Sequence, residues 1–136
     1  MKIPYRIQAI KTAQFAIFPD KMILGKNVDI GTQFQFGVNK ELNNIRCICT
    51  INYFQGDILL MVLELHCFFD VAPDGVGQLK KEKKLPVDFL RYIATIVVGT
   101  ARGVIHARTE STVLNQIVLP PINLVDLIKN DFEFEK

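Results

Sequence analysis

Cysteine, histidine and carboxylate side chains are the residues of this sequence that could do chemistry. Cys47 and Cys49 are separated by one residue of an alternating segment, so their side chains lie on one face of a predicted strand. They lack the second pair of Cys or His residues that a closed tetrahedral zinc site needs. His66 and Cys67 are neighbours in another predicted strand and therefore face opposite sides of it. We expect all three cysteines to be buried as small apolar residues, with no bound metal and no cofactor.

Signatures of catalysis do not emerge from the remaining polar residues. Glu64 and Asp70 share a face of the same predicted strand, but neither has a partner that points to acid–base chemistry. The sequence contains no G-x-S-x-G, Walker-type or H-E-x-x-H motif. Gly99 and Gly103 lie inside a predicted helix and not ahead of one, so they do not form a phosphate-binding loop. We therefore expect a protein that is not an enzyme.

Composition and charge narrow the function classes further. The chain has 136 residues and a net charge of +2, which indicates a single domain and argues against nucleic-acid binding. Lys80, Lys81, Lys83 and Lys84 form a basic cluster that we interpret as a solvated loop. The mean hydropathy is +0.22, and 49% of the residues are hydrophobic. Because a domain of this size buries a modest fraction of its surface, some apolar side chains are expected to face another copy or a ligand.

The sequence also bears on cellular location. The N-terminal residues contain no apolar signal segment, and the most apolar runs, Ile58–Leu63 and Ile93–Val98, are far shorter than the roughly 20 residues of a membrane-spanning helix. An odd number of cysteines favours a reducing compartment. We expect a soluble cytoplasmic protein with no membrane insertion.

Alternation of apolar and polar residues predicts four strands in the first half of the chain. They cover residues 5–17, 28–38, 45–53 and 58–71, and a change of phase at Ile10 predicts a bulge in the first strand. Residues 72–85 are expected to be a linker rich in Pro, Gly and Lys. Apolar spacings of three and four then predict a long helix over residues 86–109.

The segment after this helix is expected to be mostly irregular. Val113–Leu119 is predicted to be an extended arm ended by two prolines, and Asn123 is expected to cap a short helix over Leu124–Asn130. Residues 132–135 are too few to fold alone. The expected fold is a single α+β domain: a four-stranded antiparallel sheet with one long helix and a short C-terminal helix on one face.

Two segments of the chain resemble the SecB family of protein-export chaperones. Tyr5–Thr12 is similar to the family's opening strand, with an aromatic residue, Ile-Gln, a further Ile and a Thr. The second segment resembles the family's helix end, its extended arm and the start of its last helix. It consists of Ala101-Arg102, Leu114, Gln116-Ile117, Leu119 and Pro121–Leu124. The order of the elements matches over nearly the whole chain.

The resemblance implies both an assembly and a function. SecB-like subunits pair through the first strand and the long helix and form a homotetramer, a dimer of dimers. They hold unfolded preproteins in long apolar grooves without ATP, through multivalent contacts of low sequence specificity. The residues expected at the subunit interface are Tyr5, Ile7, Ile10, Ile93, Val97, Gly99, Ala101 and Gly103. The residues expected to line the client groove are Phe34, Phe36, Leu60, Val62, Phe68, Leu114, Ile117, Leu119 and Leu124.

The chain departs from the family pattern where export-dedicated members bind the SecA motor. Gln14, Phe18 and Val62 stand at positions that are acidic in those members, no zinc-binding or acidic tail follows the last helix, and Asn115 replaces a proline in the arm. These differences argue against SecA as a partner and leave the expected fold unaffected. A second role in the family, protection of an antitoxin in a toxin–antitoxin system, needs the groove and not the motor.

A third hypothesis comes from another class of protein. A curved sheet around a long helix could bind a small apolar ligand such as a lipid, and it would then be a monomer with an enclosed cavity. The linear apolar arm and the two glycines of the helix favour the chaperone, because such glycines allow close approach of another helix or sheet. Native mass spectrometry distinguishes multiples of the subunit from a monomer that retains a ligand.

Overall fold

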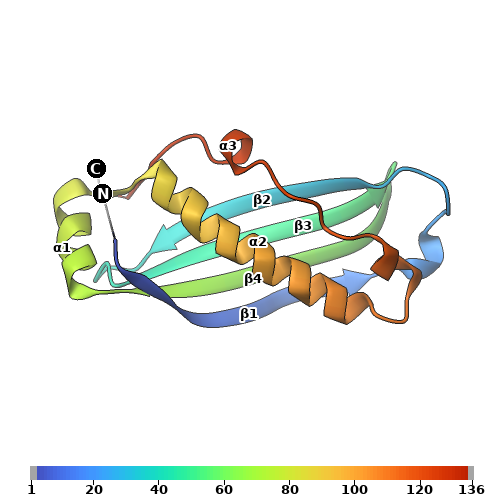
Figure 1. The fold of residues 1–136 in the computed structure, drawn as a ribbon, viewed down its shortest axis with the longest axis horizontal. Coiled ribbons are helices and arrows are strands. Elements are labelled where there is room, and N and C mark those ends of the chain that lie inside the picture. Colours follow the sequence, from blue (N-terminus) through green and yellow to red (C-terminus); the bar gives the residue numbers. More distant parts are fainter. Residues whose placement is uncertain (1–2, 135–136) are drawn as a thin grey trace.

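Strands β1 to β4 form one antiparallel sheet in the computed structural model, which describes residues 3–134 (Figure 1). The strands are β1 (Tyr5–Ile17), β2 (Asp29–Val38), β3 (Asn44–Gln55) and β4 (Ile58–Val71), and their order in the sheet is β1-β4-β3-β2. Residues 18–28, which include the short 3-10 helix η1 (Pro19–Lys21), cross from one edge of the sheet to the other. The four predicted strands and the α+β architecture are confirmed.

Helix α2 (Val87–Thr109) lies across one face of this sheet, which we call the inner face (Figure 1). Its apolar positions recur at helical spacing. They share one core cluster with fully buried side chains of β3 and β4, such as Ile45, Tyr53, Leu63 and Phe69. The predicted long helix is thus confirmed, and the core lies between it and the sheet. Within residues 3–134, no helix combines the length and the apolar character that crossing a membrane requires.

Strand β1 contains two irregularities. Its register with β4 shifts between Ile7 and Ala9 and again between Thr12 and Gln14. The change of phase predicted at Ile10 corresponds to the first of these shifts. Each shift leaves one residue of β1 unpaired, so the side chains that follow point to the opposite face from the one that strict alternation would give them.

A third irregularity lies near the start of β4. Tyr53 pairs with Met61, whereas the next residue, Phe54, pairs with Leu59, so Leu60 has no partner in the register. Leu60 and Met61 are both fully buried as a result. Strict alternation would have placed these two neighbours on opposite faces.

Residues 72–85 are not the linker that their composition predicted. They form helix α1 (Pro73–Glu82) and the two-residue strand β5 (Lys84–Leu85). A proline and an aspartate suit the first turn of the helix, and two lysines suit its last turn. Gly75 faces the sheet so closely that a Cβ there would lie 2.7 Å from Val71 Cγ1. The glycine that suggested a loop is therefore needed for helix packing.

The C-terminal region also differs from expectation. Val113–Gln116 forms the 3-10 helix η2 in place of an extended strand-like arm, and helix α3 (Leu124–Leu127) ends before the predicted Asn130. Asn123 caps α3 as predicted, because its Oδ1 accepts a hydrogen bond from the Asp126 amide at 3.3 Å.

The tail, which was predicted to be too short to fold alone, contains strand β6 (Phe132–Glu133). It pairs with β5 in a second, two-stranded sheet. Strands of two residues leave no periodicity, so the sequence pattern could not reveal them. Glu135, the last residue of the predicted tail, lies outside the described residues.

Candidate functional site

The segment after α2 runs back along the helix in the opposite direction. We call residues 113–134 the arm; in Figure 1 it lies on the side of α2 nearer to β2. Leu114, Leu119 and Ile128 anchor it in the core, with 0%, 2% and 6% of their surfaces exposed. Ile117 and Leu124 are half-buried against the same core. The four arm residues that were predicted to line a groove therefore face the body of the subunit.

Arg102 of α2 holds the middle of the arm by its main chain. Its Nε donates to the Leu119 carbonyl oxygen at 2.8 Å, and its Nη2 donates to the Pro120 carbonyl oxygen at 3.2 Å. The buried Tyr53 hydroxyl has no hydrogen-bond partner among the described atoms. Burial raises the pKa of Tyr53 to about 12, and the positive charge of Arg102 partly opposes this shift.

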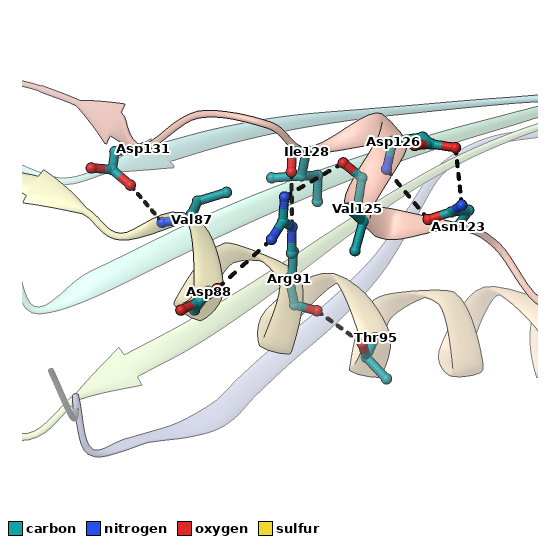
Figure 2. A network of polar contacts seen from close by, with 9 residues as sticks. All are labelled: Val87, Asp88, Arg91, Thr95, Asn123, Val125, Asp126, Ile128 and Asp131. Atoms are coloured by element: carbon teal, nitrogen blue, oxygen red, sulfur yellow. Dashed lines mark hydrogen bonds and ion pairs between the residues drawn. The ribbon is translucent and has the colours of Figure 1, made fainter.

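Arg91 makes the same kind of contact about three helical turns earlier (Figure 2). Its Nε donates to the Ile128 carbonyl oxygen at 2.9 Å, and its Nη2 donates to the Val125 carbonyl oxygen at 3.4 Å. Its Nη1 lies 3.7 Å from Asp88, which is largely exposed. The main role of this guanidinium in the fold is thus to bind the arm's backbone.

The end of the arm caps the start of α2. Asp131 Oδ1 accepts a hydrogen bond from the Val87 amide at 2.8 Å, and its Oδ2 lies 3.1 Å from Lys84 Nζ (Figure 2 shows the first contact). The Val87 amide and then the Lys84 ammonium lower the pKa of Asp131 below its usual value. A carboxylate at a helix N-terminus is also favoured by the helix dipole.

The other predicted groove residues lie on both faces of the sheet. Phe34 and Phe36 are half-buried on the inner face of β2, each opposite a buried cysteine of β3. Val62 and Phe68 are half-buried on the outer face of β4. Leu60 is fully buried. Because adjacent residues of a strand alternate in direction, these five side chains do not line one continuous groove in a single subunit.

The three cysteines are free thiols buried within the inner layer. Cys47 and Cys67 are directly opposite each other in the β3–β4 register. Burial raises the pKa of Cys49 to about 12 and that of Cys67 to about 11, and it raises the pKa of Cys47 as well. They are packing residues, as predicted. Among the described residues, no group of three or more His, Cys, Asp or Glu side chains is arranged to hold a metal ion.

An exposed apolar cluster at one end of the sheet was missed by the sequence analysis. Phe18, Ile23, Leu24 and Ile58 are between 37% and 70% exposed. Three of them lie in or beside the crossover between β1 and β2, which has no periodicity to interpret. The one feature of the sequence that points to this cluster is the run of three apolar residues at 22–24, between a lysine and a glycine.

Gln55 holds this crossover in place. Its side chain is almost fully buried, and its Oε1 accepts from the Ile23 amide at 2.8 Å. Its Nε2 donates to the carbonyl oxygens of Ile23 at 2.8 Å and Lys26 at 3.3 Å. The loop backbone is therefore tied down while the Ile23 and Leu24 side chains point to solvent.

Three of the predicted interface residues belong to the core of the subunit. Ile93, Val97 and Ala101 are fully buried on the α2 face that covers the sheet. The helix has one broad apolar face and uses it within its own subunit, so these side chains are not available at a surface. Tyr5 is half-buried, and its ring packs edge-on against Phe89 with the centroids 5.4 Å apart.

The remaining predicted interface residues are accessible. Ile7 and Ile10 of edge strand β1 are 43% and 49% exposed. Gly99 and Gly103 lie on the outward stripe of α2, where a Cβ would meet nothing within 4 Å. The same stripe exposes Ile96, and Tyr92 nearby is 70% exposed. Within residues 3–134, no other element makes the close approach that the two glycines predict.

Comparison with solved structures identifies this architecture. The chain is similar to the Mycobacterium tuberculosis Rv1957 SecB-like chaperone, whose structure was solved in complex with a ChAD peptide from the Rv1956 HigA1 antitoxin. The TM-score is 0.54, the alignment covers 87% of this chain and 90% of that chain, and 10% of the residues are identical. This chain has a SecB-like fold. No protein-family model and no curated protein matches the sequence.

The outer face of the sheet is half exposed. Two of the three positions at which this chain differs from SecA-binding members of the SecB family lie on that face. Gln14 of β1 pairs with Glu64 of β4, and Val62 lies on the same face. The Glu64 carboxylate is 2.6 Å from His66 Nε2. The third position, Phe18, is at the end of the sheet with 37% of its surface exposed. The acidic side chain nearest to these positions in the register is thus already paired.

Proposed function

We propose that this chain is the subunit of a cytoplasmic, ATP-independent chaperone that binds unfolded polypeptides, with an antitoxin as the favoured client. The observation that carries the proposal is the SecB-like fold shared with a chaperone that was solved with an antitoxin peptide. The binding function needs no nucleotide and no catalytic group.

An antitoxin is preferred over preproteins for two reasons. The similar chaperone is bound to an antitoxin segment, and Gln14 and Val62 on the outer face do not provide negative charge for a motor protein. Preproteins for export remain the second proposal for the client. Either client would present apolar side chains from an extended chain.

The inner face of β2 suits such a client. Phe34 and Phe36 are half-buried there, and β2 is an edge strand of the sheet. An edge strand offers main-chain hydrogen-bonding groups to an extended peptide, while apolar side chains bind in neighbouring pockets. The exposed crossover residues Ile23 and Leu24 add apolar surface at the end of the sheet.

We further propose that the subunits assemble as a dimer of dimers. Edge strand β1 exposes Ile7 and Ile10, and the outward stripe of α2 exposes Ile96 beside two glycines. Burial of these surfaces between copies would remove apolar area from water. The glycines would let a helix of another subunit approach closely.

Suppression of aggregation tests the binding function. A chemically unfolded model protein is diluted into buffer with and without the purified chain, in the absence of nucleotide, and light scattering is followed. We expect suppression at about equimolar subunit concentration, and weaker suppression by Phe36→Gln. Gln35→Ala, on the opposite face of the same strand, is the matched control. Equal scattering with and without the chain would contradict the proposal.

Native mass spectrometry tests the assembly and the competing class of function. The proposal expects masses at multiples of the subunit, with the tetramer predominant. A monomer that carries a small apolar molecule would instead support the lipid-binding hypothesis.

A further inference from the structure

The contacts that Arg91 and Arg102 make with the arm use groups that every polypeptide contains. Arg91 and Arg102 each donate two hydrogen bonds, and all four acceptors are main-chain carbonyl oxygens. A carbonyl oxygen is present in every residue, so these contacts do not depend on the sequence of the bound chain. The guanidinium fork is well suited to two acceptors at once.

The apolar contacts of the arm are equally general. Leu119 and Ile128 each bury one aliphatic side chain beside the carbonyl group that an arginine binds. Residues 117–123 are neither helix nor strand, and the four-residue helix α3 follows them before Ile128. An unfolded polypeptide with apolar residues at similar spacing could supply both the side chains and the carbonyl groups.

A small cavity lies where the arm meets α2. The cavity of about 20 Å³ is lined in part by Arg102, His106 and Asn115, and this volume is enough for one water molecule. The nearby Tyr53 hydroxyl is buried without a partner among the described atoms. A buried hydroxyl without a hydrogen bond is destabilising, and the docked arm does not supply a partner for it.

We propose that a client segment replaces residues 117–134 on α2, so that Arg91 and Arg102 bind the carbonyl oxygens of the client. The inference rests on the proposed chaperone function and specifies where the extended polypeptide binds and why its sequence matters little. The arm is then an intramolecular competitor of the client. Weaker docking of the arm increases the fraction of subunits that can bind, and therefore the apparent affinity.

Hydrogen exchange on the wild-type protein tests the replacement. The probe is reduced and carboxymethylated α-lactalbumin, a permanently unfolded polypeptide. In the free protein, the Ile128 amide donates to the Leu124 carbonyl oxygen at 2.8 Å and should be protected. At saturating probe, we expect this amide to lose protection while amides of β3 keep theirs. Binding without any change in the arm would overturn this inference alone, whereas failure to bind would overturn the proposed function with it.

Two sets of variants separate a contact that only the arm makes from contacts that the arm and the client share. Ile128→Ala loosens the arm without altering α2, and we expect the dissociation constant for the same probe to fall about fivefold. Arg91→Gln and Arg102→Gln remove donors that the arm and the client share. The weaker client contact and the looser arm then offset each other, and we expect the dissociation constant to change by less than about twofold. Lys129→Gln, at an exposed arm position next to Ile128, is the control that should leave the dissociation constant unchanged.

A different result would follow if the arm were a permanent wall of the binding site. Ile128→Ala would then weaken binding of the probe, and that outcome would overturn the inference. Circular dichroism verifies that each variant is folded. The exchange experiment on the wild-type protein stays decisive if a variant does not fold.

Discussion

Single polar side chains in this protein stabilise irregular segments by binding their main chains. Gln55 satisfies both the amide and the carbonyl group of Ile23, as a neighbouring strand would do. Arg91 and Arg102 act in the same way on the arm. Buried backbone groups need such partners, because an unpaired group loses its hydrogen bonds to water. Non-periodic segments can therefore take a defined path with few buried apolar side chains.

Replacement of Gln55 by alanine should destabilise the fold by about 2 kcal/mol, because it leaves main-chain groups of the crossover unpaired. Gln55→Glu should also destabilise, since a carboxylate can accept from the Ile23 amide but cannot donate to the Ile23 carbonyl oxygen. Urea unfolding followed by circular dichroism measures both effects. An unchanged midpoint for Gln55→Ala would show that the crossover does not depend on this side chain.

At the scale of elements, α1 shows how one glycine can be required and a neighbouring glycine dispensable. Gly75 is buried against β4, whereas Gly77, two residues later, has nothing within 4 Å of the position that a Cβ would occupy. Glycine lowers helix stability through its backbone entropy in both cases. Packing therefore decides which of the two positions must remain glycine.

The two alanine substitutions should change the free energy of unfolding in opposite directions. Gly75→Ala places a methyl group 2.7 Å from Val71 Cγ1 and 3.0 Å from Ile3 Cγ2, and should cost about 1–3 kcal/mol. Gly77→Ala should stabilise the protein by about 0.5–1 kcal/mol. Thermal unfolding of the two variants provides the comparison. Equal midpoints would mean that α1 is not packed on β4 as described.

The connection between the arm and α2 should depend on pH. The ionised form of Asp131 accepts from the Val87 amide and pairs with Lys84, so its pKa is lowered from 3.8. Because the pKa is lowered in the folded protein, ionised Asp131 stabilises the fold at pH values above its ordinary pKa. This stabilisation is lost as the pH falls through the lowered pKa. We expect the NMR signal of the Val87 amide to titrate with a midpoint below 3.8. Asp131→Asn should abolish that transition; a transition that persists would assign it to another group.

At the scale of the whole molecule, the sheet and α2 form two layers, and each layer leaves one surface uncovered in the subunit. The outward stripe of α2 and the edge of β1 expose apolar side chains that the core does not need. Soluble proteins usually cover such patches with partners. The proposed contacts between copies would cover the exposed apolar side chains of β1 and α2.

Charge on the outward stripe of α2 should lower the mass of the assembly. Ile96 is 37% exposed in the subunit, so Ile96→Glu should fold, yet it would bury an unpaired carboxylate in the proposed contact between copies. We expect light scattering to report a dimer or a monomer. Val125→Glu, on the exposed side of the arm, should keep the wild-type mass. An unchanged mass for Ile96→Glu would remove this stripe from the interface.

Periodicity along the chain was sufficient to predict the elements in which many residues carry the pattern. Four alternating segments and one long amphipathic segment specified the α+β architecture, because binary pattern dictates which face of each element is buried. The buried cysteines and the Asn123 cap followed from similarly local rules. The groove and interface residues were predicted from apolar character and from the family resemblance. Apolar character does not distinguish Leu60 or Val97 in a core from Ile7 at an edge.

Contacts between residues that are distant in the sequence determined the remaining features. The bulge at Leu60, the packing of Gly75 and the pairing of β5 with β6 each depend on such contacts. The course of the arm depends on hydrogen bonds from Arg91 and Arg102 to main-chain atoms. These bonds leave no pattern in the side chains of the arm, since every residue carries the same carbonyl group.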